Sequence, residues 1–392
     1  MRLAVISHSY PSEVNPIAAK FVKDQVGIIA NSKEIETLLL VPTPYAIPFT
    51  SRYHRNNSIL LSENHTSSRI QYLSFPKKIF PRIIRKSLSK NLEVVLEGYE
   101  PDLIHFHWAY PDGLSIPRLK KKGFKCILSI HGSDWYKSIS EPVLKTLIFE
   151  SLEAADLILC SGPDLKENIS EFLPHLSKNI REVYNFVDET KYDIPDADQK
   201  SNACQQLNWD QSKINVIIVA NLQPEKGPDF LIDCVQELNK ENKGESMHFH
   251  LIGMSDNSKF AQSIIERISK LSNLNYYPAV APDELLTYYH GADFFLSVSK
   301  REGFGLAMIE AAACGLPVVS TPVGIAPKFI NDTIGFVSED HSLTSIVDCI
   351  LKLRENLVSY NSQNIRNHAI QTFGISSFKE RLFSFYQEVL RR

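Results

Sequence analysis

Two glutamates in a glycine-rich stretch at residues 294–321, FFLSVSKREGFGLAMIEAAACGLPVVST, form the clearest chemical pattern in the chain. The letters predict a short apolar strand, a loop, a helix that stops at a glycine, and a second strand. Glu302 lies in the loop and Glu310 lies about a turn and a half into the helix. Free backbone N–H groups and the helix dipole at such a turn favour an anion such as phosphate. Because two carboxylates cannot both be buried without partners, we expect them to face a polar cleft.

A lysine and a histidine follow two other predicted strands. Lys226 precedes Gly227 in the loop after the apolar strand 214–220, and a strand-to-helix junction of this kind favours contact with a diphosphate. The alternative is a lysine that contacts only solvent. His131 follows the predicted strand 126–130, and the glycine after it lets the backbone approach a ligand closely. Since ligands of doubly wound sheets bind at the carboxyl ends of strands, we expect both residues to be functional.

The segment DLIHFHWAYPDG at residues 102–113 ends another predicted strand and carries two histidines, a tryptophan and an aspartate into the next loop. His105 and His107 are two residues apart on the strand, so both could face one side. A third ligand is not evident there, and no cluster of carboxylates offers the ligands that Mg²⁺ or Mn²⁺ usually takes. We therefore expect no bound metal.

The composition indicates a two-domain globular protein without a nucleic-acid partner. A chain of 392 residues exceeds one typical domain, and 43% hydrophobic with 22% charged residues is ordinary for globular proteins. The net charge of −3 provides no basic field for nucleic acid. No apolar run reaches the roughly 18 residues that span a bilayer, and the N-terminus lacks a signal-peptide pattern. Six scattered cysteines without C-x-x-C spacing are expected to be reduced, so a cytoplasmic location is the default.

Strand-like apolar runs alternate with helical segments along both halves of the chain, which predicts parallel sheets covered by helices on both faces. The first run, 2–7, is followed by residues 8–12 (HSYPS) rather than by G-x-G-x-x-G, and no glycine occurs before Gly27. We therefore expect no dinucleotide cofactor in this half.

The stretch that carries Glu302 and Glu310 closely resembles the donor-site signature of the retaining glycosyltransferases of family 4, the glycosyl transferases group 1. The matching residues are Glu302-Gly303-Phe304-Gly305, Glu310-Ala311 and Gly315-Leu316-Pro317-Val318-Val319. The resemblance covers nearly the whole chain, is strong at 294–321 and 219–230, and is moderate at 103–134. It implies the α/β GT-B architecture, in which two doubly wound Rossmann-like domains face an interdomain cleft. It also implies a nucleotide-sugar donor as substrate, no cofactor and no metal.

The resemblance also predicts where the domains lie. The expected parts are an N-terminal acceptor-side domain at 1–193, a linker at 194–212, a donor domain at 213–372, and a C-terminal helix at 373–392 that crosses back to the first domain.

Roles for individual residues follow from the same resemblance. Lys226 and the amides of 303–306 would stabilise the leaving diphosphate, and Glu310 would hold the ribose. Glu302 would hold a sugar hydroxyl, and His131 would hold the donor from the opposite domain. The expected catalytic residues are His131, Lys226 and Glu302; the donor-binding residues are Asn221, Val280, Arg301, Gly303, Phe304, Gly305, Leu306 and Glu310; the acceptor-side residues are His107, Asp112 and Asp134. No covalent nucleophile stands out, which fits attack by the acceptor on the face that the diphosphate leaves.

Departures from the family pattern leave the identity of the acceptor undetermined and keep two alternative functions open. Asn221 stands where the family usually has an arginine, which removes a bidentate phosphate clamp that Lys300 or Arg301 could replace. Residues 12–20 lack the usual glycine pair, and 324–328 replaces a glycine-glycine-glutamate turn. We expect transfer to a cell-surface polysaccharide, a glycan or a lipid-linked acceptor. The alternatives are a nucleotide-sugar isomerase and a non-catalytic subunit that binds a sugar nucleotide.

A basic stretch, KKIFPRIIRKSLSK at residues 77–90, contains six basic residues and no acidic one. Apolar residues recur through it and beyond at helical spacing. One interpretation is a surface helix packed on the sheet with solvated lysines. The other is a helix that contacts anionic lipid, which would place the protein on the inner face of a membrane.

Overall fold

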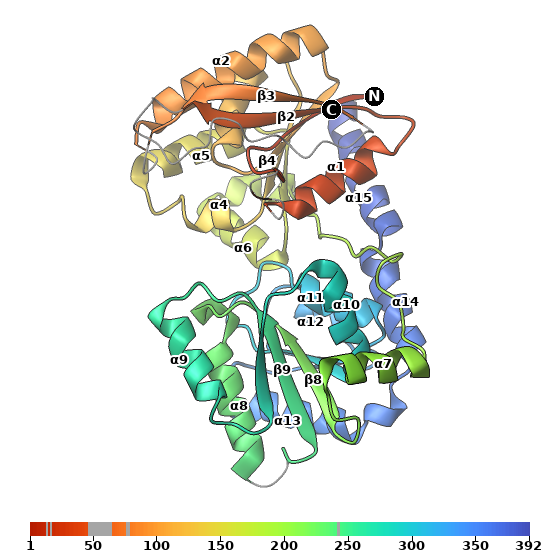
Figure 1. Ribbon diagram of the computed structural model, residues 1–392. Coiled ribbons are helices and arrows are strands. Elements are labelled where there is room, and N and C mark those ends of the chain that lie inside the picture. Colours follow the sequence, from red (N-terminus) through yellow and green to blue (C-terminus); the bar gives the residue numbers. More distant parts are fainter. Residues whose placement is uncertain (13–14, 16–17, 46–64, 76–78, 241–243) are drawn as a thin grey trace. The chain divides into compact units, whose positions relative to one another are not determined.

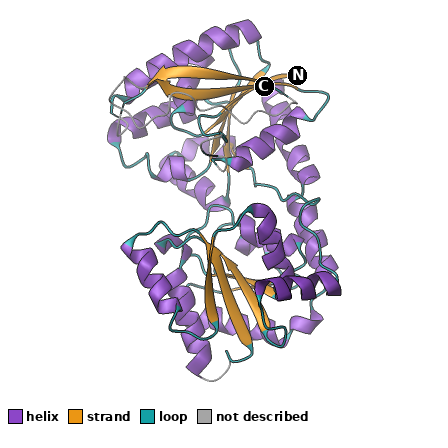
Figure 2. Cartoon of the chain, in the orientation of Figure 1, coloured by secondary structure: helices purple, strands orange, loops and turns teal. Residues whose placement is uncertain are grey.

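The computed structural model describes residues 1–12, 15, 18–45, 65–75, 79–240 and 244–392. The chain forms two compact units, one made of Met1–Tyr184 together with Phe378–Arg392 and the other of Asn185–Ser377 (Figure 1). Each unit contains one parallel β-sheet with helices packed against it, as the colouring of Figure 2 shows. The doubly wound α/β class predicted from the alternation of strands and helices is confirmed.

In the described part of the first unit, seven strands form a sheet in the order β3-β2-β1-β4-β5-β6-β7, and every neighbouring pair is parallel. The strands are β1 (Arg2–Ile6), β2 (Glu36–Tyr45), β3 (Thr66–Leu73), β4 (Leu103–His107), β5 (Cys126–Ile130), β6 (Leu157–Cys160) and β7 (Ile180–Glu182). All residues of β4, β5 and β6 are buried, as expected for central parallel strands covered on both faces. The strand order reverses direction between β1 and β4, so a ligand is expected outside the carboxyl ends of these two strands.

The helices of the first unit are α1 (Lys20–Ala30), α2 (Pro81–Tyr99), α3 (Ile116–Lys120), α4 (Ser133–Tyr136), α5 (Pro142–Ala154), α6 (Pro163–Phe172) and most of α15 (Ile375–Arg391). Helix α2 lies beside β3 (Figure 1). The apolar part of its buried face consists of Ile84, Leu88, Leu92 and Leu96, which are four residues apart and therefore share one face. These four residues belong to the hydrophobic core of the first unit. At these positions the basic stretch and its continuation therefore form a surface helix packed on the sheet, which is the first of the two interpretations.

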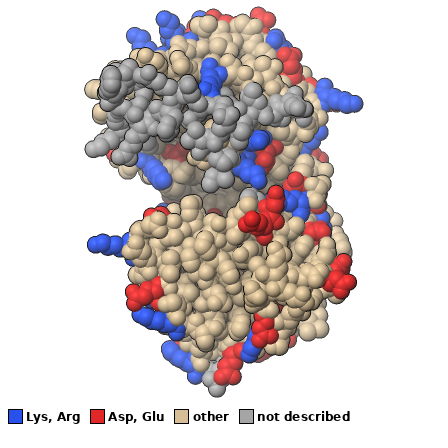
Figure 3. Space-filling view, viewed as in Figure 1, with Lys and Arg blue, Asp and Glu red and all other residues tan. Residues whose placement is uncertain are grey.

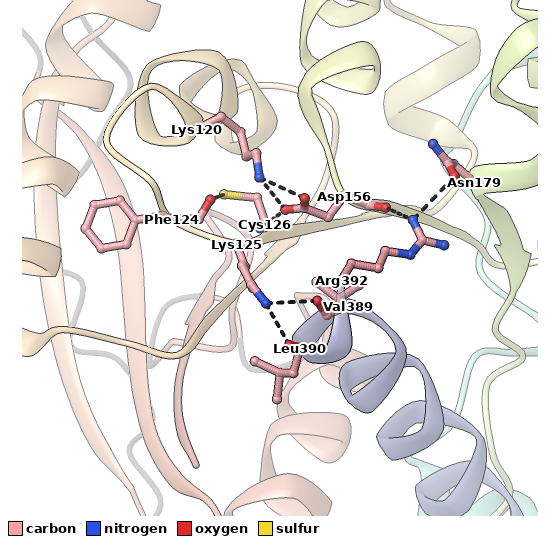
Figure 4. A network of polar contacts seen from close by, with 9 residues as sticks. All are labelled: Lys120, Phe124, Lys125, Cys126, Asp156, Asn179, Val389, Leu390 and Arg392. Carbon is pink, nitrogen blue, oxygen red and sulfur yellow. Dashed lines mark hydrogen bonds and ion pairs between the residues drawn. The ribbon is translucent and has the colours of Figure 1, made fainter.

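The last turn of α15 is fastened to the first unit by a polar network (Figure 4). The Lys125 ammonium donates hydrogen bonds to the carbonyls of Val389 (3.3 Å) and Leu390 (2.7 Å), which have no acceptor role inside the helix. The Arg392 guanidinium donates to the carbonyl of Asp156 at 2.9 Å. A cation at a helix C-terminus also complements the helix dipole. These contacts assign the end of α15 to the first unit.

In the second unit, six described strands follow the order β10-β9-β8-β11-β12-β13, again all parallel. They are β8 (Ile214–Val219), β9 (Met247–Gly253), β10 (Leu274–Pro278), β11 (Phe294–Ser297), β12 (Val318–Ser320) and β13 (Gly335–Val337). The helices are α7 (Ala197–Leu207), α8 (Pro228–Lys240), α9 (Lys259–Ile268), α10 (Pro282–Gly291), α11 (Leu306–Ala313), α12 (Ala326–Phe329), α13 (Leu343–Glu355) and α14 (Ser362–Phe373). The strand order corresponds to 3-2-1-4-5-6, with its switch point between β8 and β11.

The prediction that residues 194–212 form a linker between the units is wrong. The boundary between the units lies between Tyr184 and Asn185, and α7 fills most of the supposed linker. A capping box starts that helix: the Asp196 side chain accepts from the Gln199 backbone, and the Gln199 side chain accepts from the Asp196 backbone. Helix α7 packs on α10, so the segment is part of the second unit's fold.

The C-terminal helix expected at 373–392 corresponds to α15, which starts at Ile375, just after α14 ends at Phe373. Gly374 between them has an extended backbone (φ −67°, ψ 166°) and pairs with Val187 in a parallel bridge. Their separation follows from this backbone geometry, since an extended residue interrupts the helical hydrogen-bond pattern.

Candidate active site

Two loops meet at the switch point of the second unit, one after β8 and one after β11. A side chain at Gly227 would place its Cβ 2.2 Å from the carbonyl oxygen of Val298, so only glycine fits this close approach. The Gly227 φ angle of 66° also favours glycine. The carbonyl of Glu225 accepts hydrogen bonds from the amides of Lys300 and Arg301 at 2.9 and 3.1 Å. The two loops are therefore held together through their backbones.

Lys226 and Glu302 are brought together by these loops. The Lys226 ammonium and a Glu302 carboxylate oxygen are 2.5 Å apart, and each side chain is about one-quarter exposed (27% and 22%). Both line a pocket of about 220 Å³ with the ends of β8 and β11 and the start of α11. This volume is below the roughly 300 Å³ at which small-molecule pockets begin, so the pocket by itself accommodates only part of a large ligand.

The N-terminus of α11 forms one wall of the same pocket, through Gly305, Leu306 and Ala307. Gly305 has a φ angle of 100°, which turns the loop into the helix. The first amides of a helix have no intrahelical acceptor, so they are available to an anion. Gly303 is exposed in the preceding loop.

Phe304 has a different position from its neighbours. Its side chain is 5% exposed and packs edge-on against Phe373, with the ring centroids 5.2 Å apart. The Phe304 carbonyl accepts a hydrogen bond from the amide of Ile325 at 3.2 Å. The side chain therefore anchors the loop in the core and does not line the pocket.

Glu310 lies on the second turn of α11 and is partly exposed. Its two carboxylate oxygens accept hydrogen bonds from two tyrosines, Tyr192 at 2.7 Å and Tyr289 at 2.9 Å. The sequence pattern did not indicate either tyrosine, because they lie 118 and 21 residues away along the chain.

Of the two residues that could replace an arginine at position 221, Lys300 is engaged elsewhere. The Asn221 side-chain oxygen accepts from the Met254 amide at 3.0 Å, so this residue joins its loop to the end of β9. The Lys300 ammonium is paired with Asp229 at 2.7 Å, and Arg301 is exposed. Val280 is partly exposed and lies in the turn that follows β10, an edge strand of the second sheet.

In the first unit, His131 lies in a row of three histidines. The His107 Nδ1 and the His131 Nε2 are 3.1 Å apart, with the rings nearly parallel at 3°. The His105 ring stacks on His107, and its own nitrogens bond the Tyr386 hydroxyl (2.8 Å) and the Ser129 hydroxyl (2.7 Å). Burial lowers the pKa of all three histidines, and that of His107 falls to about 3. The row is therefore neutral at physiological pH.

His107 supports His131 rather than an acceptor. It is completely buried, and its Nε2 atom has no hydrogen-bond partner. A buried acceptor without a hydrogen-bond partner costs less free energy than a buried N–H without one. We therefore assign the proton to His107 Nδ1, which then donates a hydrogen bond to His131 Nε2. The expected acceptor-side role of His107 is therefore incorrect for a residue without access to solvent.

Asp134 and Asp112 are also buried, which argues against direct contact with an acceptor. The Asp134 carboxylate accepts from the amides of Ala109 (2.6 Å) and His131 (3.0 Å), and so ties two loops together. The Asp112 carboxylate accepts from the amide and Nδ1 of His8 at 2.9 and 3.0 Å. Burial raises the pKa of both carboxyl groups.

His8 is a candidate that the sequence interpretation missed. It follows β1 at the switch point of the first sheet, and its side chain is 32% exposed. The buried Asp112 carboxylate contacts the ring through Nδ1. A histidine directly after the first strand was visible in the sequence, but its aspartate partner lies 104 residues further on.

No group of three metal-ligating side chains is found among the described residues. Their six cysteines are all buried free thiols. None of the helices that the structure describes is long and apolar enough to cross a bilayer.

Two known families match this chain. Residues 199–371 match the family described as Glycosyl transferases group 1, and residues 48–191 match Glycosyltransferase Family 4. The chain belongs to these glycosyltransferases. N-acetyl-alpha-D-glucosaminyl L-malate synthase from Bacillus anthracis is 25% identical over 316 residues, which cover 78% of this chain and 79% of that protein. A D-inositol 3-phosphate glycosyltransferase from Segniliparus rotundus is 34% identical over 145 residues, 36% of this chain and 32% of that protein.

Solved structures share the fold of this glycosyltransferase over its whole length. Sucrose-phosphate synthase from Thermosynechococcus elongatus has a TM-score of 0.74 at 17% identity, covering 100% of this chain and 99% of that one. Anabaena Alr3699/HepE in complex with UDP and glucose has a TM-score of 0.73 at 15% identity, covering 99% and 100%. The GT-B fold class implied by the resemblance is thereby confirmed.

Proposed function

We propose that this glycosyltransferase moves a sugar from a nucleotide-sugar donor to an acceptor hydroxyl with retention of configuration and without a metal. The observation that carries the proposal is the set of cationic and N–H groups at the second switch point: Lys226 beside Glu302, facing the start of α11. The bound nucleotides named for structural neighbours support the choice of donor, since the HepE structures contain UDP and UDP-glucose.

The pocket fits the charge that develops during transfer. As the bond between the sugar and the diphosphate breaks, negative charge gathers on the leaving phosphate. Lys226 and the amides at the start of α11 would stabilise that charge more strongly in the transition state than in the ground state. The Glu302 carboxylate, which holds Lys226 in the free protein, would accept a donor-sugar hydroxyl. His131 would contact the donor through its backbone or ring.

The acceptor step needs no protein nucleophile in this proposal. The acceptor oxygen bonds to the anomeric carbon on the face that the diphosphate leaves, and the departing phosphate oxygen takes the acceptor's proton. A cell-surface polysaccharide, a glycan or a lipid-linked sugar remains our choice of acceptor.

The test is a screen of UDP-, GDP- and ADP-sugars by thermal shift and by release of the nucleoside diphosphate, with and without EDTA. A donor at 100 times its Kd raises stability by about 2.7 kcal/mol. We expect one class of donor to bind and to be turned over equally well in EDTA, with the anomeric configuration kept when the product is analysed by NMR. Activity that disappears in EDTA and returns with Mg²⁺ would contradict metal independence, and binding without turnover on any acceptor would favour a non-catalytic subunit.

Substitution of the two glutamates is expected to separate nucleotide binding from sugar binding. Glu310→Ala should weaken UDP binding at least tenfold, because hydrogen bonds to a charged group contribute about 1.5–3 kcal/mol each. Glu302→Ala should leave UDP affinity unchanged or increase it, since the Lys226 ammonium loses its 2.5 Å carboxylate partner and is freed for phosphate. Calorimetry with UDP and with UDP-glucose measures both effects. Equal losses of UDP affinity in the two variants would contradict the assignment.

Membrane contact through the start of α2 is a second part of the proposal. Ile79, Phe80 and Ile83 are exposed by 52%, 56% and 43%, although the rest of the apolar stripe is core. Arg82 and Lys86 are exposed beside them. Lys77 and Lys78 of the basic stretch lie outside the described residues. These features support a peripheral contact with anionic lipid on the inner face of a membrane.

One basic residue of the stretch and two lysines elsewhere in the first unit are paired with carboxylates. Arg85 is paired with Glu150, Lys120 with Asp156, and Lys122 with Glu93 and Glu97. On the face shown in Figure 3, basic and acidic side chains are also interspersed. The contact must therefore depend on the few residues at the start of α2.

We expect the protein to sediment with vesicles that contain anionic lipid and to be released as salt rises. The double change Arg82→Gln and Lys86→Gln should weaken binding roughly thirtyfold, at about 1 kcal/mol per charge. The matched control is Lys259→Gln with Lys352→Gln, which removes two exposed charges from the second unit. If the protein does not sediment with these vesicles at low salt, the proposed membrane contact is contradicted. A soluble acceptor is then the better proposal.

A further inference from the structure

The second unit has another pocket, at the opposite edge of its sheet from the candidate active site. This pocket has a volume of about 450 Å³ and is formed by the turn before β13 and the segment between α13 and α14. We call it the asparagine pocket, because Asn356, Asn361 and Asn364 are among its lining residues. It lies at the amino end of β13, whereas the pocket of Lys226 and Glu302 lies at the carboxyl ends of β8 and β11. Since these strands are parallel, the two pockets are on opposite edges of the sheet.

The polar side chains of the asparagine pocket keep much of their hydrogen-bonding capacity. The Asn356 side-chain amide donates to the carbonyl of Lys352 at 2.8 Å, which leaves its oxygen as an acceptor. The Asn361 side-chain oxygen accepts from the Asn364 backbone amide at 2.9 Å, which leaves its NH₂ group as a donor. Within the described part of the chain, neither the Asn364 side chain nor the Asp332 carboxylate has a hydrogen bond or an ion pair. Donors and acceptors therefore lie side by side in this pocket.

Two aromatic side chains lie among these polar groups. Phe336 on β13 and Tyr360 just before α14 line the pocket, are partly exposed and pack against the hydrophobic core of the second unit. Packing against the core fixes both rings in place. Burial and the nearby Asp332 carboxylate raise the pKa of Tyr360, so its hydroxyl stays protonated and can donate a hydrogen bond.

This lining matches a neutral ligand with many hydroxyl groups. A sugar hydroxyl both donates and accepts hydrogen bonds, as the amide and hydroxyl side chains of the pocket do. The C–H groups of a pyranose ring can pack on an aromatic ring whose polar end forms a hydrogen bond. A phosphate or a diphosphate is disfavoured, because Asp332 is the only charged group among the described lining residues and it is negative.

The simpler explanation is a set of surface side chains that contact only water. It accounts for the asparagines, which are exposed, but not for two partly exposed aromatic rings in the same hollow. The volume also falls within the range of about 300–1,000 Å³ that is typical of small-molecule sites.

We propose that the asparagine pocket is a second carbohydrate site, which binds one neutral pyranose unit of a glycan away from the catalytic centre. The inference goes beyond the proposed function and does not depend on it, because none of the described residues lines both pockets. In a transferase that acts on a glycan, such a site tethers a remote unit of the chain. Tethering raises the effective concentration of the rest of that chain around the protein.

The experiment measures the binding of methyl pyranosides of glucose, galactose, mannose and N-acetylglucosamine to the whole chain by saturation-transfer difference NMR and titration. We expect the wild type to bind at least one of them. The double change Asp332→Ala and Asn364→Ala should weaken that binding by about tenfold or more, because a hydrogen bond to a charged group is lost together with those of the amide. Both side chains are exposed, so the fold should be retained.

The matched control is Asp348→Ala with Asn367→Ala, which changes exposed residues of α13 and α14 outside the pocket. This control should keep the wild-type affinity for the sugar. Glu302→Ala should also keep it, since this change affects the candidate active site instead. Melting temperatures of all variants check that the fold is intact.

Three results would overturn the inference: a wild type that binds none of these sugars, an unchanged affinity in the double variant of the pocket, or an equal loss in Glu302→Ala. Each would leave the proposed function standing, because release of the nucleoside diphosphate tests that function separately. A wild type that binds the sugar through the asparagine pocket but turns over no donor would overturn the proposed function alone.

Discussion

Replacement of Lys226 by alanine is expected to lower kcat about a hundredfold to a thousandfold, with little change in stability. The ammonium lines the pocket beside the N-terminus of α11, where the leaving diphosphate is proposed to gather charge. Removal of one preorganised donor to such a charge costs about 3 kcal/mol in the transition state. The residue is on a loop and partly exposed, so its truncation leaves no large cavity. The measurement is the rate of nucleoside diphosphate release at saturating donor.

The control for this substitution is Lys300→Ala. Lys300 follows β11 and is paired with Asp229 at 2.7 Å, outside the residues that line the pocket. It should keep kcat within about twofold. Lys226→Met adds a comparison of similar length without the charge. Near-normal turnover in both Lys226 variants would remove this lysine from the catalytic set.

Acidification from pH 7.5 to 5.5 is expected to destabilise the first unit by about 4 kcal/mol through the row of His105, His107 and His131. Burial depresses the pKa of His105, His107 and His131 in the folded state, whereas an unfolded histidine titrates near 6.5. Protons therefore bind the unfolded chain more tightly. The stability is fully present above about pH 6.5 and is lost as the pH falls toward the folded-state values, at about 1.4 kcal/mol per histidine per pH unit.

Urea unfolding at the two pH values measures this loss. His105→Phe should reduce the pH dependence by about one third, because one titrating group is removed from the row. His175→Gln is the control, since this histidine belongs to the same unit and its side chain is 60% exposed. A decrease of less than about 1 kcal/mol in the free energy of unfolding of the wild type between the two pH values would contradict the prediction. It would mean that histidines of the row are protonated in the folded protein.

Much of the fold follows from local sequence. Continuous apolar runs such as INVIIV at 214–219 are typical of strands buried on both faces, and the structure places such runs at the centres of two parallel sheets. The positions of Lys226 and Glu302 in loops at strand ends were also predictable. Once the sheet is parallel, the carboxyl ends of its strands lie on one edge, so residues that follow neighbouring strands meet.

The roles of several candidates depended on tertiary contacts that no local pattern contains. Asn221 is used to join its loop to Met254, and His107 supports His131 from a position without solvent access. The boundary of the units also moved, because α7 packs on α10 instead of serving as a linker. Burial and packing decide such roles, and both depend on elements that are distant in the sequence.

The sequence by itself determined the fold class, the family and the positions of the loops that carry Lys226 and Glu302, since each depends on residues close together along the chain. Only the tertiary structure decided which side chains hold the functional groups in place. Tyr192 reaches Glu310 across 118 residues, and His8 reaches Asp112 across 104. Such pairs arise because the strand order places β1 beside β4 and the segment before α7 beside α11. A hydrogen bond depends on that spatial arrangement and not on the distance along the chain.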